Sequence, residues 1–173
     1  MKHHQNEKDE FIVEDIDENF STWLNKDYIS PELRAKLSQA HVLILPYENF
    51  RGEKYNPFPV NTDTLFLYLK EALKSKYVAN ILIEDSDYCE VKIESKINRI
   101  GIFIISAVVL PLFLTILGNY IYDNYLKSDK SGNIKMEIKV IGEKKSKSFK
   151  FEGDPKHFKE ISDEIQKLWN ETE

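Results

Sequence analysis

Cysteine is almost absent from this chain, whose 173 residues contain one, Cys89, together with only 6 glycines and 6 prolines. A single cysteine excludes a disulfide framework and a cysteine-based zinc site. The scarcity of glycine and proline, beside a hydrophobic fraction of 42%, excludes collagen-like, mucin-like and wholly disordered proteins. The length is that of one domain of ordinary size.

The sequence motifs of common enzymes are missing as well. The chain has no glycine-rich phosphate loop, no His-Glu-x-x-His and no Gly-x-Ser-x-Gly. His41 and His157 have no partner at the spacing of a metal site. We therefore expect a protein that is not an enzyme and that holds no cofactor and no metal.

The net charge of -5 is located at the N-terminus, because residues 1–20 contain seven acids and two lysines. The remaining residues sum to zero, so the body of the chain has no overall bias towards nucleic acid. We predict that residues 1–22 form an acidic, disordered head. The alternative is an autoinhibitory or partner-docking tail.

One long apolar run dominates the middle of the chain. Residues 100–122 carry no charge, and 14 of these 23 are Ile, Leu, Val or Phe. A helix of that length spans roughly 34 Å, against about 30 Å for the hydrocarbon core of a bilayer. We predict a single-pass transmembrane helix in the cell inner membrane, with a buried helix of a soluble core as the alternative.

Four residues of this run differ from its aliphatic background: Ser106, Pro111, Thr115 and Asn119. A central proline removes one backbone hydrogen bond and should kink a helix. At helical spacing Thr115 and Asn119 share a face, so several copies could place a weak polar stripe around a pore or a helix-packing contact. Alternatively, the hydroxyl groups satisfy backbone carbonyls near the proline.

The segments on either side of the run predict an α/β protein in two parts. Residues 23–98 read as an α/β soluble region with buried strands at 41–46 and 80–84 and a helix over about 64–77. Residues 123–173 read as a β-β-α region, because a hairpin pattern precedes an amphipathic helix. Such a short second part is marginal alone, which favours a homo-oligomer or a re-entrant run.

The loop after the first strand is the candidate ligand site. Ligands of α/β sheets bind beyond the carboxyl ends of strands. Aromatic rings there could stack on a base, and the cations could meet a phosphate. The candidate residues are Tyr47, Asn49, Phe50, Arg51, Lys54 and Tyr55. The alternative is an ordered loop whose aromatic rings complete the core.

The order of these segments resembles a known group of proteins. Leu45-Pro-Tyr-Glu-Asn-Phe50 precedes Phe58-Pro-Val-Asn-Thr62 and Glu84-Asp-Ser-Asp-Tyr88, then the apolar run with its proline, and finally Phe151-Glu-Gly-Asp-Pro155. The pattern is similar to small membrane effectors of bacterial antiphage defence operons, of which the Hailong type is one candidate. The resemblance implies an oligomeric membrane channel or disruptor, gated by a nucleotide or oligonucleotide made by a partner nucleotidyltransferase.

From these observations we expect an oligomeric membrane effector of a defence system, gated by a nucleotide-type ligand or a partner. The alternative is a membrane-anchored adaptor or assembly subunit without conductance. In the first case the lipid bilayer and further copies of the chain are its partners.

Overall fold

The protein is an α/β fold built on one six-stranded mixed sheet, seen here in a computed structural model that describes residues 9–93 and 95–171. The strand order is β1-β8-β7-β6-β2-β4. In that order the strands are Glu10–Asp15, Ser146–Gly153, Asn133–Ile141, Ile97–Ser106, Val42–Leu45 and Ala79–Ile81. A small second sheet pairs β3 (Phe58–Pro59) with β5 (Glu90–Val91).

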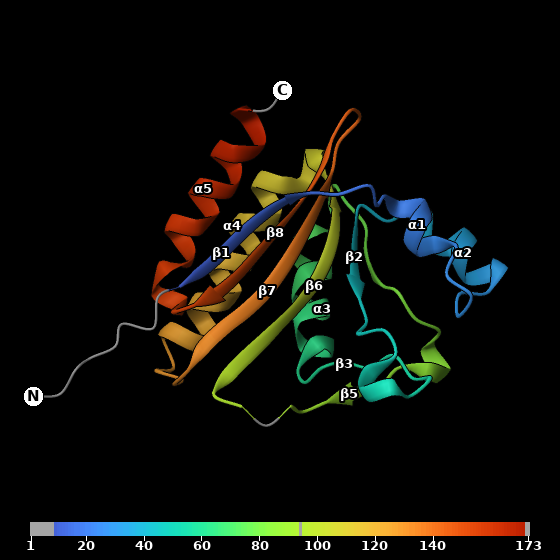
Figure 1. Cartoon of the computed structure of the whole chain (residues 1–173), viewed down its shortest axis with the longest axis horizontal. Coiled ribbons are helices and arrows are strands. Elements are labelled where there is room, and N and C mark those ends of the chain that lie inside the picture. The colour runs from blue at the N-terminus through green and yellow to red at the C-terminus, as the bar shows by residue number, and fades with distance from the viewer. Residues whose placement is uncertain (1–8, 94, 172–173) are drawn as a thin grey trace, which may run out of the picture.

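Three helices pack against one face of this sheet: α3 (Thr62–Leu73), α4 (Leu110–Ile121) and α5 (Phe158–Glu171). Figure 1 shows α3 and α4 behind the strands, with α1 (Phe20–Leu24) and α2 (Pro31–Leu37) beside β2. Those two short helices and the loop between them bury Trp23, Ile29 and Leu37 against the opposite face of β2 and β6. The opposite face of β1, β8 and β7 stays open, and its strands alternate buried and polar side chains.

The predicted transmembrane helix over residues 100–122 is wrong. The run divides into β6, a 3-10 turn at Ala107–Val109, and α4. β6 lies between β7 and β2 and buries side chains on both faces, Ile104 on one and Ile105 on the other. Pro111 falls in the first turn of α4, where its missing N–H has no intrahelical acceptor. Among the described residues, no helix is both long enough and apolar enough to cross a bilayer.

The acidic N-terminus also differs from the prediction. Residues 1–8 lie outside the described part of the chain, but β1 follows directly and pairs antiparallel with β8. The prediction of a disordered head is therefore wrong for residues 10–15. β1 is ordered because Phe11 and Val13 pack on the core while Asp15 and Glu14 contact lysines of β8.

The two predicted parts of the chain share one sheet. β6 and β7 are parallel neighbours joined by α4, and β2 and β6 are antiparallel neighbours. The hairpin predicted near residues 134–151 is present as β7 and β8, and the predicted C-terminal helix is present as α5. The segments before and after the apolar run are therefore packed together rather than separated by a membrane.

Candidate functional site

A β-bulge in β6 determines where Arg99 points. Arg99 pairs with Lys135 and Gly101 pairs with Met136, so one extra residue, Ile100, is inserted on the β6 side. Gly101 has a φ of +146°, a conformation that residues with a Cβ rarely adopt. Since the bulge shifts the alternation by one residue, Ile100 is buried and Arg99 joins the open face.

The register of the sheet places two cations side by side on that open face. Reading across four strands, Glu10 pairs with Glu152, Glu152 with Lys135, and Lys135 with Arg99. Directly opposed residues of neighbouring strands bring their side chains within about 5 Å at Cβ. This row of four side chains therefore ends in two adjacent positive charges, Lys135 and Arg99. Of these, Lys135 makes no hydrogen bond or ion pair with a described residue.

A groove of about 380 Å³ lies over this part of the face. Tyr47, which follows β2, forms part of its wall beside Arg99. Burial raises the pKa of the Tyr47 phenol, and the positive charge of Arg99 opposes that rise. The groove thus offers an aromatic ring, a guanidinium and an ammonium group to one ligand, next to the carboxylates of Glu10 and Glu152.

Arg99 also lines a second groove, of about 670 Å³, at the end of the sheet. The segment before β6, the loop before β7 and the start of α3 form its walls. Its cations are Lys92, Lys96, Arg99 and Lys130, and none of its described lining residues is acidic. Gly132 allows the close packing of the two loops, because a Cβ there would lie 2.3 Å from the Lys96 carbonyl oxygen.

We call five cations of these two grooves the basic arc: Lys92, Lys96, Arg99, Lys130 and Lys135. Lys150 also lines the first groove but lies 3.5 Å from Glu14. Arg99 donates to the Ser95 hydroxyl at 3.1 Å, and the Lys130 ammonium lies 5.0 Å from the Tyr125 ring centroid. No described carboxylate forms an ion pair with any member of the arc. Glu10, Glu137 and Glu152 also line the first groove, but no described lining residue of the second groove is acidic. The like charges of the second groove repel, so a bound anion would stabilise the arrangement.

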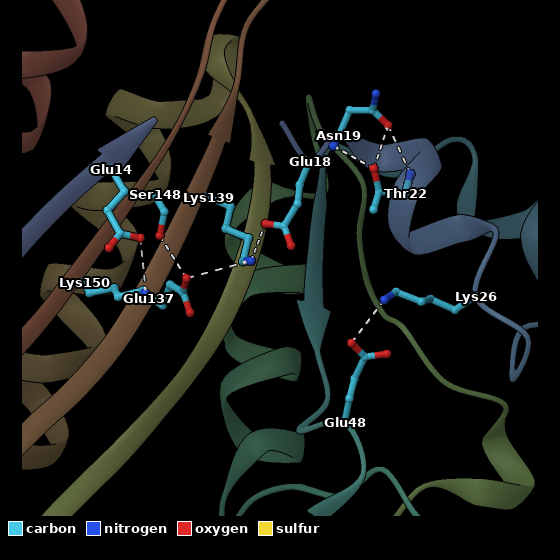
Figure 2. A network of polar contacts seen from close by, with 10 residues as sticks. All are labelled: Glu14, Glu18, Asn19, Thr22, Lys26, Glu48, Glu137, Lys139, Ser148 and Lys150. Carbon is cyan, nitrogen blue, oxygen red and sulfur yellow. Dashed lines mark hydrogen bonds and ion pairs between the residues drawn. The ribbon is translucent and has the colours of Figure 1, made fainter. Parts of the chain in front are cut away.

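A network of polar contacts makes the neighbouring part of the open face rigid. Figure 2 shows Lys139 between Glu18, from the loop after β1, and Glu137 on its own strand, and Ser148 donates to Glu137 at 2.8 Å. Lys139 is only 8% exposed, and its ammonium lies 5.3 Å from the Trp23 ring centroid. The charge of Lys139 is thus paired with two carboxylates, whereas no member of the basic arc forms an ion pair with a described carboxylate.

The loop residues expected to bind a ligand form an aromatic cluster. The Tyr47 and Phe50 rings stack with centroids 6.0 Å apart, and Tyr55 meets Phe50 edge-on. The Arg51 guanidinium carbon lies 5.0 Å from the Phe50 centroid. The loop is braced because the Asn49 N–H donates to the Asn56 side chain, and Figure 2 shows Glu48 tied to Lys26.

Of the six predicted ligand residues, Tyr47 alone lines one of the two basic grooves among the described residues. Asn49, Arg51 and Lys54 are exposed on the outer side of the loop. Asn49 and Arg51 have left-handed backbone angles, with φ of 50° and 54°. The structure thus brings the aromatic rings together but places the predicted cation, Arg51, on one of those rings.

The predicted pore residues lie at three different places. Ser106 ends β6, where its N–H donates to the His41 carbonyl, and Pro111 opens α4. Thr115 and Asn119 share the exposed face of α4, as their spacing indicates. The Thr115 hydroxyl donates to the Pro111 carbonyl oxygen at 3.1 Å, which matches the backbone role weighed above as the alternative.

Sequence reasoning missed the basic arc. Its members come from two segments more than thirty residues apart, 92–99 at the start of β6 and 130–135 at the start of β7, and the parallel pairing of these strands brings them together. The one available signal was the matching set of cations on each side of the apolar run. That set predicts a shared site only if both flanks lie at the same end of a sheet.

The described residues contain no group of three or more His, Cys, Asp or Glu side chains placed to hold a metal ion. At the first groove, Arg99, Lys135 and Tyr47 provide two cations and an aromatic ring, which can contact an anion and a flat base. No protein-family model matches this sequence, and no match is found among curated proteins or among solved structures.

Proposed function

We propose that this protein is a non-catalytic module that binds a nucleotide-type anion across the two grooves that meet at Arg99. One observation carries the proposal: Arg99 lines both grooves, with Lys135 beside it in one and three further lysines around it in the other. Phosphates favour such clustered cations on a rigid scaffold, and a base needs a flat partner such as the Tyr47 ring.

The absence of acid partners for the arc supports recognition rather than structural pairing. Three lysines of the neighbouring strands β7 and β8 are paired by contrast: Glu18 and Glu137 contact Lys139, Asp15 contacts Lys147, and Glu14 contacts Lys150. Near the second groove, Glu90 is already engaged, because its carboxylate accepts two N–H groups from the start of α3 and the Tyr88 hydroxyl. The second groove thus gathers four cations with no carboxylate among its described lining residues.

The test uses a fluorescein-labelled single-stranded tetranucleotide and measures its anisotropy with the purified full chain. Lys96→Gln and Lys135→Gln should each weaken binding about five- to tenfold and lower the slope of log K against log salt by about 0.7. Lys74→Gln on the outer face of α3 is the matched control and should leave affinity unchanged. Equal affinities for all three variants would refute the assignment of the arc.

A second probe, inorganic tripolyphosphate, separates recognition of the base from recognition of phosphate. Tyr47→Leu should weaken tetranucleotide binding by about tenfold, since one stacked base contributes about 1–3 kcal/mol. The same variant should leave tripolyphosphate binding unchanged. Equal weakening of both probes would contradict a base on Tyr47.

The loop after β2, which the sequence predicts as the ligand site, is the alternative location for the phosphate contacts. If Arg51 and Lys54 carry the phosphate contacts, Arg51→Ala should remove binding and Lys96→Gln should not. If the basic arc carries the phosphate contacts, Lys96→Gln should weaken binding and Arg51→Ala should not. The two variants change exposed side chains and should leave the melting temperature within about 2 °C of the wild type.

The defence role and the partner nucleotidyltransferase stay predictions of the resemblance. So do membrane association and the channel or disruptor activity, whose predicted spanning helix is replaced by β6 and α4. Alkaline carbonate extraction of membranes from expressing cells tests the association directly. Recovery of the chain in the supernatant would remove the bilayer from its partners and would count against both the membrane effector and the membrane-anchored adaptor.

A further inference from the structure

The two grooves that meet at Arg99 differ in their charge. The first groove is balanced, because three carboxylates and three cations line it. The second groove is lined by four cations and by no described acidic residue. Glu94 is the only acid of the segment 92–99, and it lies outside the described residues. Of the two grooves, the second therefore attracts negative charge more strongly, and a ligand that spans both should place most of its negative charge there.

The grooves also differ in their aromatic content. Tyr47 lines the first groove, and its ring stacks on Phe50 with the centroids 6.0 Å apart. The described residues that line the second groove include no phenylalanine, tyrosine, tryptophan or histidine. The uncharged side chains there belong to valine, isoleucine, proline, serine and asparagine. Because bases stack on aromatic rings, the first groove suits a base and the second does not.

Arg99 is placed to contact a phosphate where the two grooves meet. Its guanidinium donates to the hydroxyl of Ser95, a residue that lines the second groove, at 3.1 Å. A guanidinium has five N–H donors, and this is the one hydrogen bond that Arg99 makes with a described residue. The remaining donors can bind phosphate oxygens, and Lys135 beside Arg99 adds a second cation from the first groove.

The backbone of the second groove holds its two cationic segments together without a ligand. The Asn98 side-chain amide donates to the carbonyl oxygens of Ser131 and Asn133 at 3.1 and 3.3 Å. Gly132 packs directly against the Lys96 carbonyl group. These contacts fix the segment before β6 against the loop before β7. An anion bound between the two segments therefore does not have to bring them together, which would reduce its affinity.

Two kinds of nucleotide could bring several negative charges to the second groove. An oligonucleotide adds one phosphate charge with each nucleotide, and each nucleotide also brings another base. A polyphosphate chain adds charge without adding a base, and a triphosphate carries about three to four negative charges near pH 7. The second groove has four cations and no described aromatic ring, so it favours the polyphosphate chain.

We propose that the ligand is a nucleoside 5′-polyphosphate that divides its parts between the two grooves. Its base stacks on Tyr47 in the first groove, and its first phosphate binds Arg99 and Lys135. Its further phosphates bind Lys92 and Lys96 in the second groove, with Lys130 on the opposite wall. This inference rests on the proposed function, because it assigns a ligand class to the same site.

The test titrates the purified full chain with adenosine mono-, di- and triphosphate in a calorimeter, with EDTA present and at about 0.1 M salt. Adenine serves as the probe because stacking on an aromatic ring tolerates every base. With the wild type, affinity should increase about fivefold with each added phosphate. The triphosphate should also bind more tightly than the tetranucleotide, which carries no polyphosphate chain.

Variants of exposed lysines separate the roles of the two grooves. Lys92→Gln and Lys96→Gln, in the second groove, should each reduce the preference for the triphosphate over the monophosphate by about three- to fivefold. They should leave the affinity for the monophosphate within about twofold of the wild type. Lys135→Gln, in the first groove, should weaken both nucleotides by the same factor. Lys74→Gln on α3 is again the control and should change neither affinity.

The possible failures of this inference differ from failure of the proposed function. A triphosphate that binds no more tightly than the monophosphate, or less tightly than the tetranucleotide, would overturn the polyphosphate ligand while a nucleotide site remained. Inorganic tripolyphosphate that binds as tightly as adenosine triphosphate would overturn the base in the first groove. If the monophosphate, the triphosphate and the tetranucleotide all fail to bind, the proposed function falls together with this inference.

Discussion

Lys139 connects the acidic N-terminal segment to the sheet, and its removal should measurably destabilise the fold. Its ammonium contacts Glu18 from the loop after β1 and lies 3.8 Å from Glu137. Two unit charges 4 Å apart interact by about 4 kcal/mol at an effective dielectric constant of 20. Glu18 is 32% exposed at its side chain, so solvent screening and desolvation reduce the net value to about 2 kcal/mol.

Lys139→Met keeps most of the apolar stem and removes the charge. We expect it to lower the free energy of unfolding by about 2 kcal/mol and the melting temperature by about 6 °C. A double-mutant cycle with Glu18→Gln, followed by urea unfolding, isolates the pair from the other contacts of each residue. The cycle should give an interaction free energy of about 1–2 kcal/mol that decreases only slightly with salt.

The control is the pair of Glu14 and Lys150, which joins β1 to β8 and is 53% and 44% exposed. The equivalent cycle there should give about 0.5 kcal/mol or less, and salt should abolish it. Equal interaction free energies for the two pairs would refute the argument, because burial is the stated reason for the difference.

Three further predictions concern other contacts of the fold. Glu90→Ala removes the carboxylate that caps the first turn of α3 and accepts from Tyr88, and urea unfolding should show a loss of about 2 kcal/mol. Gly101→Ala forces a Cβ into a φ of +146° and within 3.2 Å of the Phe103 ring, so it should redirect Arg99 and weaken tetranucleotide binding in the anisotropy assay. Burial raises the pKa of Tyr120 to about 12, so the stability that its neutral phenol provides is complete below about pH 10 and is lost as the pH rises through 12. Urea unfolding at pH 9 and 11.5 should show this loss in the wild type and a smaller one in Tyr120→Phe.

Helices and strands with one buried and one solvent-exposed face could be predicted from the sequence. The hairpin of β7 and β8 alternates apolar and polar residues, and α5 repeats Phe158, Ile161, Ile165 and Leu168 at helical spacing. In both cases half of the element meets water, so the pattern of polar residues reveals the period. The start of α2 carries an equally clear signal in the sequence, because Ser30 caps the helix and Pro31 occupies its first position.

The apolar run could not be interpreted in this way. β6 is buried on both faces and α4 has an uncharged outer face, so no polar residue marks the period of either element. Length then favoured one long helix. Two local signals favoured the observed division: the β-branched isoleucines up to Ile105, typical of a strand, and Pro111, typical of a helix start.

The candidate site was hidden by the same misinterpretation. Lys92, Lys96 and Arg99 precede the apolar run, and Lys130 and Lys135 follow it. As flanks of a transmembrane helix they would lie on opposite sides of a membrane. Parallel pairing of β6 and β7 brings both sets to one end of the sheet, a long-range contact that no local pattern encodes. The aromatic loop, by contrast, was visible because its residues are neighbours in sequence.

The pairing of β1 with β8 has a consequence for synthesis. Glu10 pairs with Glu152 and Asp15 with Lys147, so the first strand of the sheet finds its only described strand partner near the end of the chain. During translation β1 stays unpaired until β8 has left the ribosome. Its acidic residues give that waiting strand a charge that discourages pairing with the strands of other nascent chains. The acidity of the N-terminus thus protects the chain before folding, and the lysines of β8 neutralise it once folding is complete.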